Sequence, residues 1–110
     1  MSDDRLRQSM LLDFYGELLT DKQRECCELH FNEDLSLAEI AEEEEISRQG
    51  VHDKVKRALA QLKDYEDKLG LVKRFLEQKE SVSEAIALID NKKYEDARKV
   101  LAKLSEEIEE

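Results

Sequence analysis

The stretch at residues 35–62, LSLAEIAEEEEISRQGVHDKVKRALAQL, has the spacing of a short helix, a turn and a second helix. Its first part places three apolar residues on one helical face: Leu37, Ile40 and Ala41. Ile46 then fills the turn, and the small Ala41 allows the two helices to cross closely. The second part carries an inner apolar stripe at helical spacing: Val51, Val55, Ala58 and Leu62. The sequence therefore predicts a helix-turn-helix.

The second helix of this motif presents polar side chains at the end nearest the turn. With Val51 at the centre of the buried stripe and about 100° of rotation per residue, three of them point outward: Gln49, His52 and Lys56. Arg48 and Arg57 lie toward the flanks, where cations suit phosphates, whereas outward side chains suit base edges. The candidate nucleic-acid-binding residues are therefore Ser47, Arg48, Gln49, His52, Lys56 and Arg57. The alternative is a plain helical bundle whose polar surface happens to resemble a reading helix.

The charge of the chain as a whole argues against nucleic-acid binding. It has 28 acidic and 18 basic residues, which gives a net charge of −10. That sign is unfavourable for a protein that binds phosphate. Residues 46–63 are the exception, with five basic residues and the single acid Asp53. Asp53 points outward and would repel a phosphate backbone. The acidic run at residues 42–45 is typical of a solvated surface, and it would weaken non-specific binding to DNA.

The composition favours an all-α fold, since 42% of the residues are charged, there is no proline and there are only three glycines. We expect a helix-turn-helix domain at residues 1–70. The remaining residues, 71–110, are expected to form a C-terminal helical extension that packs on the first part or on a second subunit. No apolar run reaches the length of about 18 residues that a membrane span needs, and no secretory segment is present. The sequence thus predicts a cytoplasmic protein without membrane insertion.

Capping signals divide the chain into helices. A first amphipathic helix is expected at about residues 4–18, and Thr20 is the N-cap of a second at residues 21–31. Ser36, followed by Glu39, is a capping box for the third helix, and Ser47 caps the fourth in the same manner. The fourth helix meets no breaker before Gly70. A segment from residue 82 and a final helix at residues 94–108 then form a hairpin. The long fourth helix and the apolar cluster at residues 71–76 offer more apolar surface than one small helical domain covers, which predicts a homodimer.

No residue set for catalysis, a cofactor or a metal emerges from the sequence. Cys26 and Cys27 are adjacent, so they point in different directions from a helix and cannot form a CxxC pair. Together with His30 they cannot all reach one tetrahedral zinc ion. We expect two reduced thiols that pack as apolar side chains, in a protein that is not an enzyme and binds no cofactor.

Several segments resemble those of the YlxM family of small bacterial helix-turn-helix proteins. The similarity covers about residues 14–76 and is carried by FYGELLT at residues 14–20, KQR at 22–24, EIAE at 39–42, SRQ at 47–49 with Val51, KR at 56–57, DYE at 64–66 and KLGL at 68–71. The resemblance implies an all-helical fold similar to region 4 of sigma factors. It also implies a role in the signal recognition particle pathway, with the particle's RNA, its GTPase subunit or both as partners.

This chain departs from the usual helix-turn-helix pattern at Glu45, where a glycine often accommodates a left-handed turn. We expect the turn to be reshaped there, which counts against docking on DNA. The leading hypothesis is a non-enzymatic accessory protein that binds structured RNA through the second helix of the motif. The alternatives are a DNA-binding regulator of the sigma region 4 type and an adaptor that binds only protein.

Overall fold

The computed structural model describes residues 3–109, and these residues form helices and connecting turns throughout. The helices are α1 (Asp3–Tyr15), the short 3-10 helix η1 (Gly16–Leu18), α2 (Asp21–Phe31), α3 (Leu37–Glu44), α4 (Arg48–Leu69), α5 (Leu71–Asp90) and α6 (Tyr94–Glu109). This confirms the predicted all-α class. Within the described range, no helix combines the length and the apolar character needed to cross a membrane.

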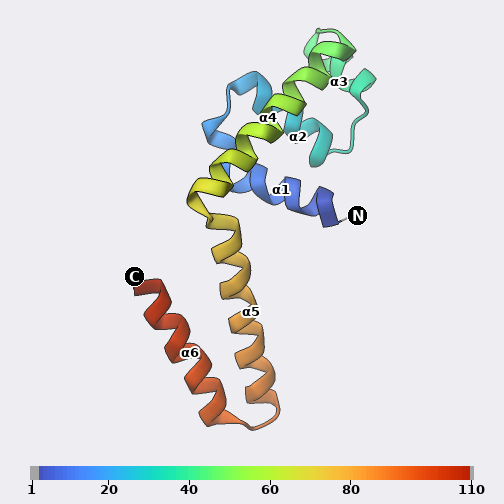
Figure 1. Ribbon diagram of the computed structural model, residues 1–110. Helices are drawn as coiled ribbons and strands as arrows, with labels where there is room; N and C mark the ends of the chain where they lie inside the picture. The colour runs from blue at the N-terminus through green and yellow to red at the C-terminus, as the bar shows by residue number, and fades with distance from the viewer. Residues whose placement is uncertain (1–2, 110) are drawn as a thin grey trace. The chain divides into compact units, whose positions relative to one another are not determined.

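The chain divides into two compact units, with the boundary between Val72 and Lys73. We call residues up to 72 the helix-turn-helix unit and residues from 73 the hairpin unit, and we describe each by itself. In Figure 1, α1 to α4 gather into the first unit, and the greater part of α5 forms an antiparallel pair with α6 in the second.

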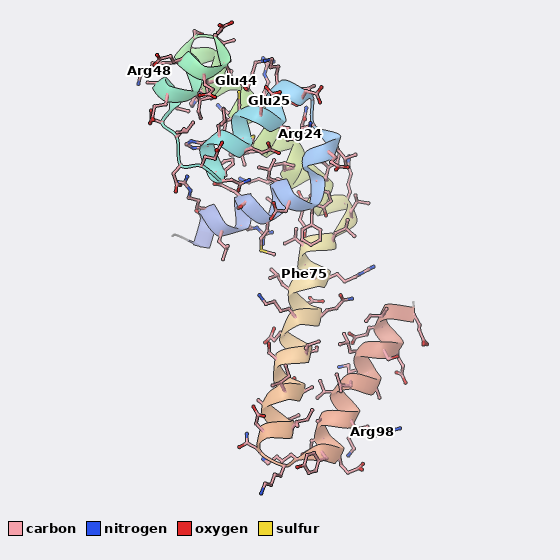
Figure 2. The ribbon with its side chains drawn as sticks, turned by 180° about the vertical axis from the view of Figure 1, so that it is seen from behind. Arg24, Glu25, Glu44, Arg48, Phe75 and Arg98 are labelled. Atoms are coloured by element: carbon pink, nitrogen blue, oxygen red, sulfur yellow. The ribbon has the colours of Figure 1, made fainter. Side chains whose placement is uncertain are left out.

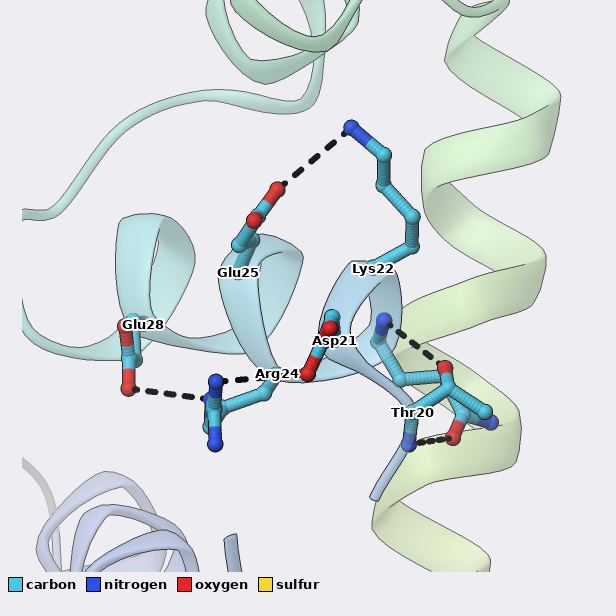
Figure 3. A network of polar contacts seen from close by, with 7 residues as sticks. Thr20, Asp21, Lys22, Arg24, Glu25 and Glu28 are labelled. Carbon is cyan, nitrogen blue, oxygen red and sulfur yellow. Dashed lines mark hydrogen bonds and ion pairs between the residues drawn. The ribbon is translucent and has the colours of Figure 1, made fainter. Parts of the chain in front are cut away.

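The predicted N-caps of α2 and α3 are confirmed. The Thr20 hydroxyl accepts a hydrogen bond from the Gln23 backbone N–H at 3.2 Å, and the Gln23 side chain accepts one from the Thr20 N–H at 3.1 Å (Figure 3). Ser36 and Glu39 form the same reciprocal pair, with both bonds at 3.1 Å. Each box satisfies two N–H groups that the first turn of a helix leaves without an intrahelical partner.

The remaining contacts in Figure 3 are exposed ion pairs along α2. The Arg24 guanidinium lies 3.4 Å from Asp21 and 4.0 Å from Glu28, and the Lys22 ammonium lies 3.5 Å from Glu25. Pairs of this kind at helical spacing contribute a few tenths of a kcal/mol each. They support the helix without deciding the fold.

The first helix ends earlier than the predicted residue 18. The α-helical pattern stops at Tyr15, and residues 16–18 form a tighter 3-10 turn that the Leu19 N–H closes by donating to the Gly16 carbonyl at 3.1 Å. Gly16 is buried, and a Cβ there would come within 3.2 Å of the Leu12 side chain. Apolar periodicity missed this break because Leu18 continues the helical spacing even though its side chain is exposed.

The core of the helix-turn-helix unit lies along α4, which packs against α1, α2 and α3. The predicted stripe is confirmed, because its four side chains are all at most 7% exposed: Val51, Val55, Ala58 and Leu62. Leu11, Tyr15 and Ile40 bring the largest fully buried side chains from α1 and α3. Burial of one such side chain stabilises a fold by about 1.5–3 kcal/mol, so this unit has a substantial core of its own.

A buried polar cluster closes the end of this unit. The Tyr15 hydroxyl donates to the Glu66 carboxylate at 2.6 Å and accepts from the Leu71 N–H at 3.0 Å. The Val72 N–H donates to the same carboxylate oxygen at 3.0 Å. Glu66, which is 7% exposed, and Tyr15 therefore cap the first turn of α5, directly after the left-handed Gly70 that ends α4. A carboxylate is well placed there, because the N-terminus of a helix carries partial positive charge.

The hairpin unit buries much less. Its buried apolar side chains are Ala85, Ala97 and Leu104, whereas large apolar side chains along both helices are exposed: Phe75, Leu76, Val82, Ile86, Ile89, Tyr94, Leu101 and Ile108. The segment expected from residue 82 is the second half of a helix that runs unbroken from Leu71. The turn at residues 91–93 stands where predicted, with Lys92 in a left-handed conformation.

Candidate nucleic-acid interface

The turn between α3 and α4 keeps its left-handed residue although that residue is a glutamate. Glu45 has φ 57° and ψ 41°, its N–H donates to the Glu42 carbonyl at 3.4 Å, and the Ile46 N–H donates to the Ala41 carbonyl at 3.1 Å. These two bonds form a Schellman motif, the common ending of an α-helix. The expectation of a reshaped turn at Glu45 was therefore wrong. Hydrogen bonds and the packing of Ile46 against the core hold Glu45 in the left-handed conformation, which is sterically unfavourable for a residue with a Cβ atom.

Ser47 begins α4 as predicted, but without a complete capping box. Its hydroxyl accepts a hydrogen bond from the Gly50 N–H at 2.9 Å, and the third position of the helix is glycine, which has no side chain to return a bond. The expected match to the Ser36 box is thus only half present. A Cβ at residue 50 would come within 3.1 Å of the Ser47 hydroxyl oxygen, so the glycine leaves this cap uncrowded.

All six candidate residues are exposed: Ser47, Arg48, Gln49, His52, Lys56 and Arg57. Five of them come from the first ten residues of α4, and Ser47 lies directly before it. Figure 2 shows Arg48 beside Glu44, with the turn between them. A basic and polar surface therefore covers the start of α4, on the side away from the buried stripe.

Asp53 lies within this surface and contacts two of the candidates. The Gln49 amide nitrogen donates to Asp53 Oδ1 at 3.0 Å, and His52 Nδ1 lies 3.6 Å from the same oxygen. These side chains all come from neighbouring turns of α4, and Asp53 and His52 are both about half exposed. Two of the six candidate residues thus contact a carboxylate.

A polar hollow of about 350 Å³ adjoins this surface on the flank of α4. Its lining comes from the start of α2 and from α4: Thr20, Gln23, Gly50, Asp53, Lys54 and Arg57. Sequence reasoning placed Arg57 on the flank but did not include Thr20 or Gln23. Those two residues lie some thirty positions earlier, and only the packing of α2 on α4 brings them here.

The acidic run at residues 42–45 is not uniformly solvated. Its other three members are exposed, whereas the Glu44 side chain is 10% exposed, and its Oε2 lies 3.6 Å from the Lys22 ammonium. Burial and the neighbouring Glu25 raise the pKa of Glu44, although Lys22 partly opposes them. The expectation of a solvated surface was therefore wrong for Glu44. The acidic surface between α2 and α3 includes Glu25, Glu28, Glu33, Glu43 and Glu44.

The two cysteines pack as predicted. Cys26 and Cys27 are completely buried, and burial raises the pKa of Cys27 to about 12. His30 Nδ1 lies 3.2 Å from the Leu35 carbonyl oxygen, so its ring is engaged with the backbone at the end of α2. These residues belong to the core and its edge.

The geometry of α3, the Schellman turn and α4 defines a helix-turn-helix protein. The comparison with protein families agrees. The UPF0122 family, described as "putative helix-turn-helix protein, YlxM / p13 like", matches residues 2–108, and the chain belongs to this family. This confirms the resemblance seen in the sequence and extends it into the hairpin unit.

Relatives of known sequence match most of the chain. A UPF0122 protein of a Thermoanaerobacter species is 45% identical over 100% of this chain and 97% of its own length. One from Acetivibrio thermocellus is 49% identical over 93% of this chain and 91% of the relative. One from Caldanaerobacter subterraneus is 54% identical over 74% of this chain and 70% of the relative. The matches to the Thermoanaerobacter and Acetivibrio relatives therefore span both units.

Proposed function

We propose that this protein binds structured RNA through the exposed face at the start of α4. The carrying observation is that a regular helix-turn-helix presents basic and polar side chains on one exposed face, in a chain whose net charge is −10. A local cluster of cations attracts phosphate, whereas the acidic remainder weakens contact elsewhere. The proposed function is binding without a chemical step.

The shape of RNA determines how α4 would engage it. An A-form duplex has a deep, narrow major groove that side chains cannot read, so we propose contacts with loops and irregular helix ends. Arg48 and Arg57 contact phosphates in this arrangement, and Gln49 and His52 meet exposed bases. The family resemblance implies the RNA of the signal recognition particle as ligand and its GTPase subunit as a second partner.

The test is the double variant Arg48→Ala, Lys56→Ala, measured against RNA over a range of salt concentrations. We expect weaker binding at every salt concentration and a smaller salt dependence, because two of the cations on this face are lost. A matched control removes two exposed cations of the hairpin unit, Lys79→Ala and Lys99→Ala, with the same change in net charge. Equal affinity of the α4 variant and the native chain would contradict the proposal.

Binding to duplex DNA is the second candidate, and the regular turn at Glu45 favours it. A regular turn of this kind is compatible with the docking of helix-turn-helix proteins, in which the second helix lies in the major groove. The same titrations with duplex DNA at physiological salt distinguish the candidates. If the protein binds a specific DNA duplex more tightly than any structured RNA, DNA binding becomes the preferred function and RNA binding the alternative.

We also propose that the protein is a homodimer held together by its hairpin unit. Eight large apolar side chains of that unit are exposed, and a second hairpin would cover them with the same surface. Sedimentation at micromolar concentration should show a dimer, and Leu101→Glu should shift it to a monomer. The control is Glu84→Lys, which changes an exposed charged residue of the same unit. A native chain that sediments as a monomer would refute this assembly.

A further inference from the structure

Asp53 stands apart from its surroundings in charge. It is the only acidic residue between Ile46 and Lys63, a segment that carries five basic residues. Its side chain is 54% exposed and lies on the same face of α4 as Gln49 and His52. A carboxylate at this place repels every phosphate backbone that approaches, so it lowers affinity unless it makes a compensating contact.

The contacts of Asp53 leave acceptor capacity unused. Gln49 Nε2 and His52 Nδ1 both approach Oδ1, and among residues 3–109 Oδ2 accepts no hydrogen bond. A carboxylate only accepts, so Gln49 must direct its amide nitrogen toward Asp53. This orientation leaves the Gln49 carbonyl oxygen as a second acceptor on the exposed face. The face therefore presents two acceptors from adjacent turns, Asp53 Oδ2 and Gln49 Oε1.

Bases differ in what they offer to such acceptors. Cytosine carries an exocyclic amino group at C4 and adenine carries one at C6, whereas the corresponding O4 of uracil is an acceptor. An amino group donates a hydrogen bond to the carboxylate, and this bond compensates for the hydrogen bonds with water that the carboxylate loses on binding. A carbonyl oxygen at the same place leaves the carboxylate desolvated and repelled, which is the more costly outcome.

We propose that Asp53 is a specificity-determining residue that accepts a hydrogen bond from the exocyclic amino group of a base. Cytosine is the preferred partner, because its N4 amino group is the usual donor to Asp and Glu in base recognition. Gln49 is held by Asp53 and supplies the adjacent acceptor. This inference rests on the proposed binding of RNA by α4, and it adds which kind of base the exposed face of α4 selects. The carboxylate rejects ligands that present only phosphate or a carbonyl oxygen, so it selects among RNAs by exclusion as well as by contact.

The experiment is selection of RNAs from a pool of stem-loops with a randomised loop, using the native chain and Asp53→Ala. The native chain should enrich loops with cytosine at one position. Replacing that cytosine by uracil should weaken native binding about ten- to a hundredfold, and it should weaken Asp53→Ala binding less than threefold. Asp67→Ala, an exposed acid near the other end of α4, is the control for net charge and should keep the native preference.

The outcomes separate this inference from the proposed function. If Asp53→Ala binds all loops more tightly by one common factor and keeps the native base preference, Asp53 only repels phosphate and the inference is wrong. If the native chain enriches loops without a position that requires an amino group, RNA binding stands and the inference fails. If the native chain enriches no RNA, both are overturned. Alanine favours a helix at an exposed position, so both variants should keep the native fold. Circular dichroism checks this for each variant.

Discussion

The two units of this protein are both helical, but they differ in what they bury. The helix-turn-helix unit encloses large side chains from four helices, among them Leu11, Tyr15, Ile40 and Leu62, each at most 1% exposed. The hairpin unit buries two alanines and Leu104 and leaves its larger apolar residues exposed. Small residues let two helices approach closely, but two helices cannot enclose a core. The first unit therefore has a core of large side chains, whereas the second leaves most of its large apolar side chains exposed.

The largest expected effect tests this difference in the core. Leu62→Ala should destabilise the helix-turn-helix unit by about 2–5 kcal/mol, because it leaves a cavity among fully buried side chains. Leu101→Ala, at a residue that is 42% exposed, should cost less than about 1 kcal/mol at concentrations where the chain is monomeric. Urea unfolding monitored by circular dichroism measures both. Equal costs would show that the hairpin unit has a core of its own.

The next effect contrasts a buried tyrosine with an exposed one. Tyr15→Phe should cost about 1–3 kcal/mol, because it removes one hydrogen-bond donor to the buried Glu66 carboxylate and the acceptor of the Leu71 N–H. Tyr94→Phe in the hairpin unit removes a hydroxyl from a side chain that is 60% exposed, and it should change stability little. Thermal unfolding of the two variants compares them directly. A Tyr15→Phe variant as stable as the native chain would mean that water replaces the hydroxyl.

A smaller effect is shared by both units, because each contains a helix ending with a left-handed residue that is not glycine. Glu45 has φ 57° and Lys92 has φ 61°. Glycine relieves the steric strain of this conformation but adds freedom to the unfolded chain, so Glu45→Gly and Lys92→Gly should each stabilise by about 0.5–1 kcal/mol. The two substitutions remove opposite charges, which separates the backbone effect from electrostatics. Opposite signs in the two variants would indicate that charge dominates.

The smallest effect depends on pH and belongs to the first unit alone. Because the pKa of Glu44 is raised above 4.5 in the folded state, its contribution is most favourable below that value and is lost as pH rises through the raised pKa. Glu44→Gln resembles the protonated form, so it should stabilise the protein at pH 7 and have little effect near pH 4. Glu84→Gln, at an exposed residue of the hairpin unit, is the control for the loss of one negative charge. Equal stability of Glu44→Gln and the native chain at pH 7 would contradict the burial argument.

Local signals in the sequence predicted most of the fold. Thr20, Ser36 and Ser47 are at the predicted N-caps, and the stripe that begins at Val51 is buried, because capping and helical periodicity act over a few residues. Continuing that stripe by four residues from Leu62 reaches Glu66, which was a usable signal for its burial. The partner of Glu66 could not be predicted in this way, since Tyr15 lies 51 residues earlier.

The candidate site was predictable in composition but not in its interactions. The exposure of residues such as Arg48 and Lys56 followed from their angle relative to the stripe. Glu45 was misjudged because residue preference outweighed the hydrogen bonds and the packing of Ile46 that hold the turn. Glu44 was misjudged because its burial comes from packing of α3 against α2, which no local pattern contains. Whether the six candidates bind a nucleic acid stays a prediction.

The Tyr15 and Glu66 cluster also determines how the chain would respond to force. The first two N–H groups of α5 are anchored to side chains inside the core of the helix-turn-helix unit. A pull on the hairpin unit would therefore load the hydrogen bonds that the Leu71 and Val72 N–H groups donate. Mechanical tension on this protein would reach α1 through the Tyr15 phenol as well as through the packing of α1 on α4, so the helix-turn-helix would bear a load applied at residues that follow it in the chain.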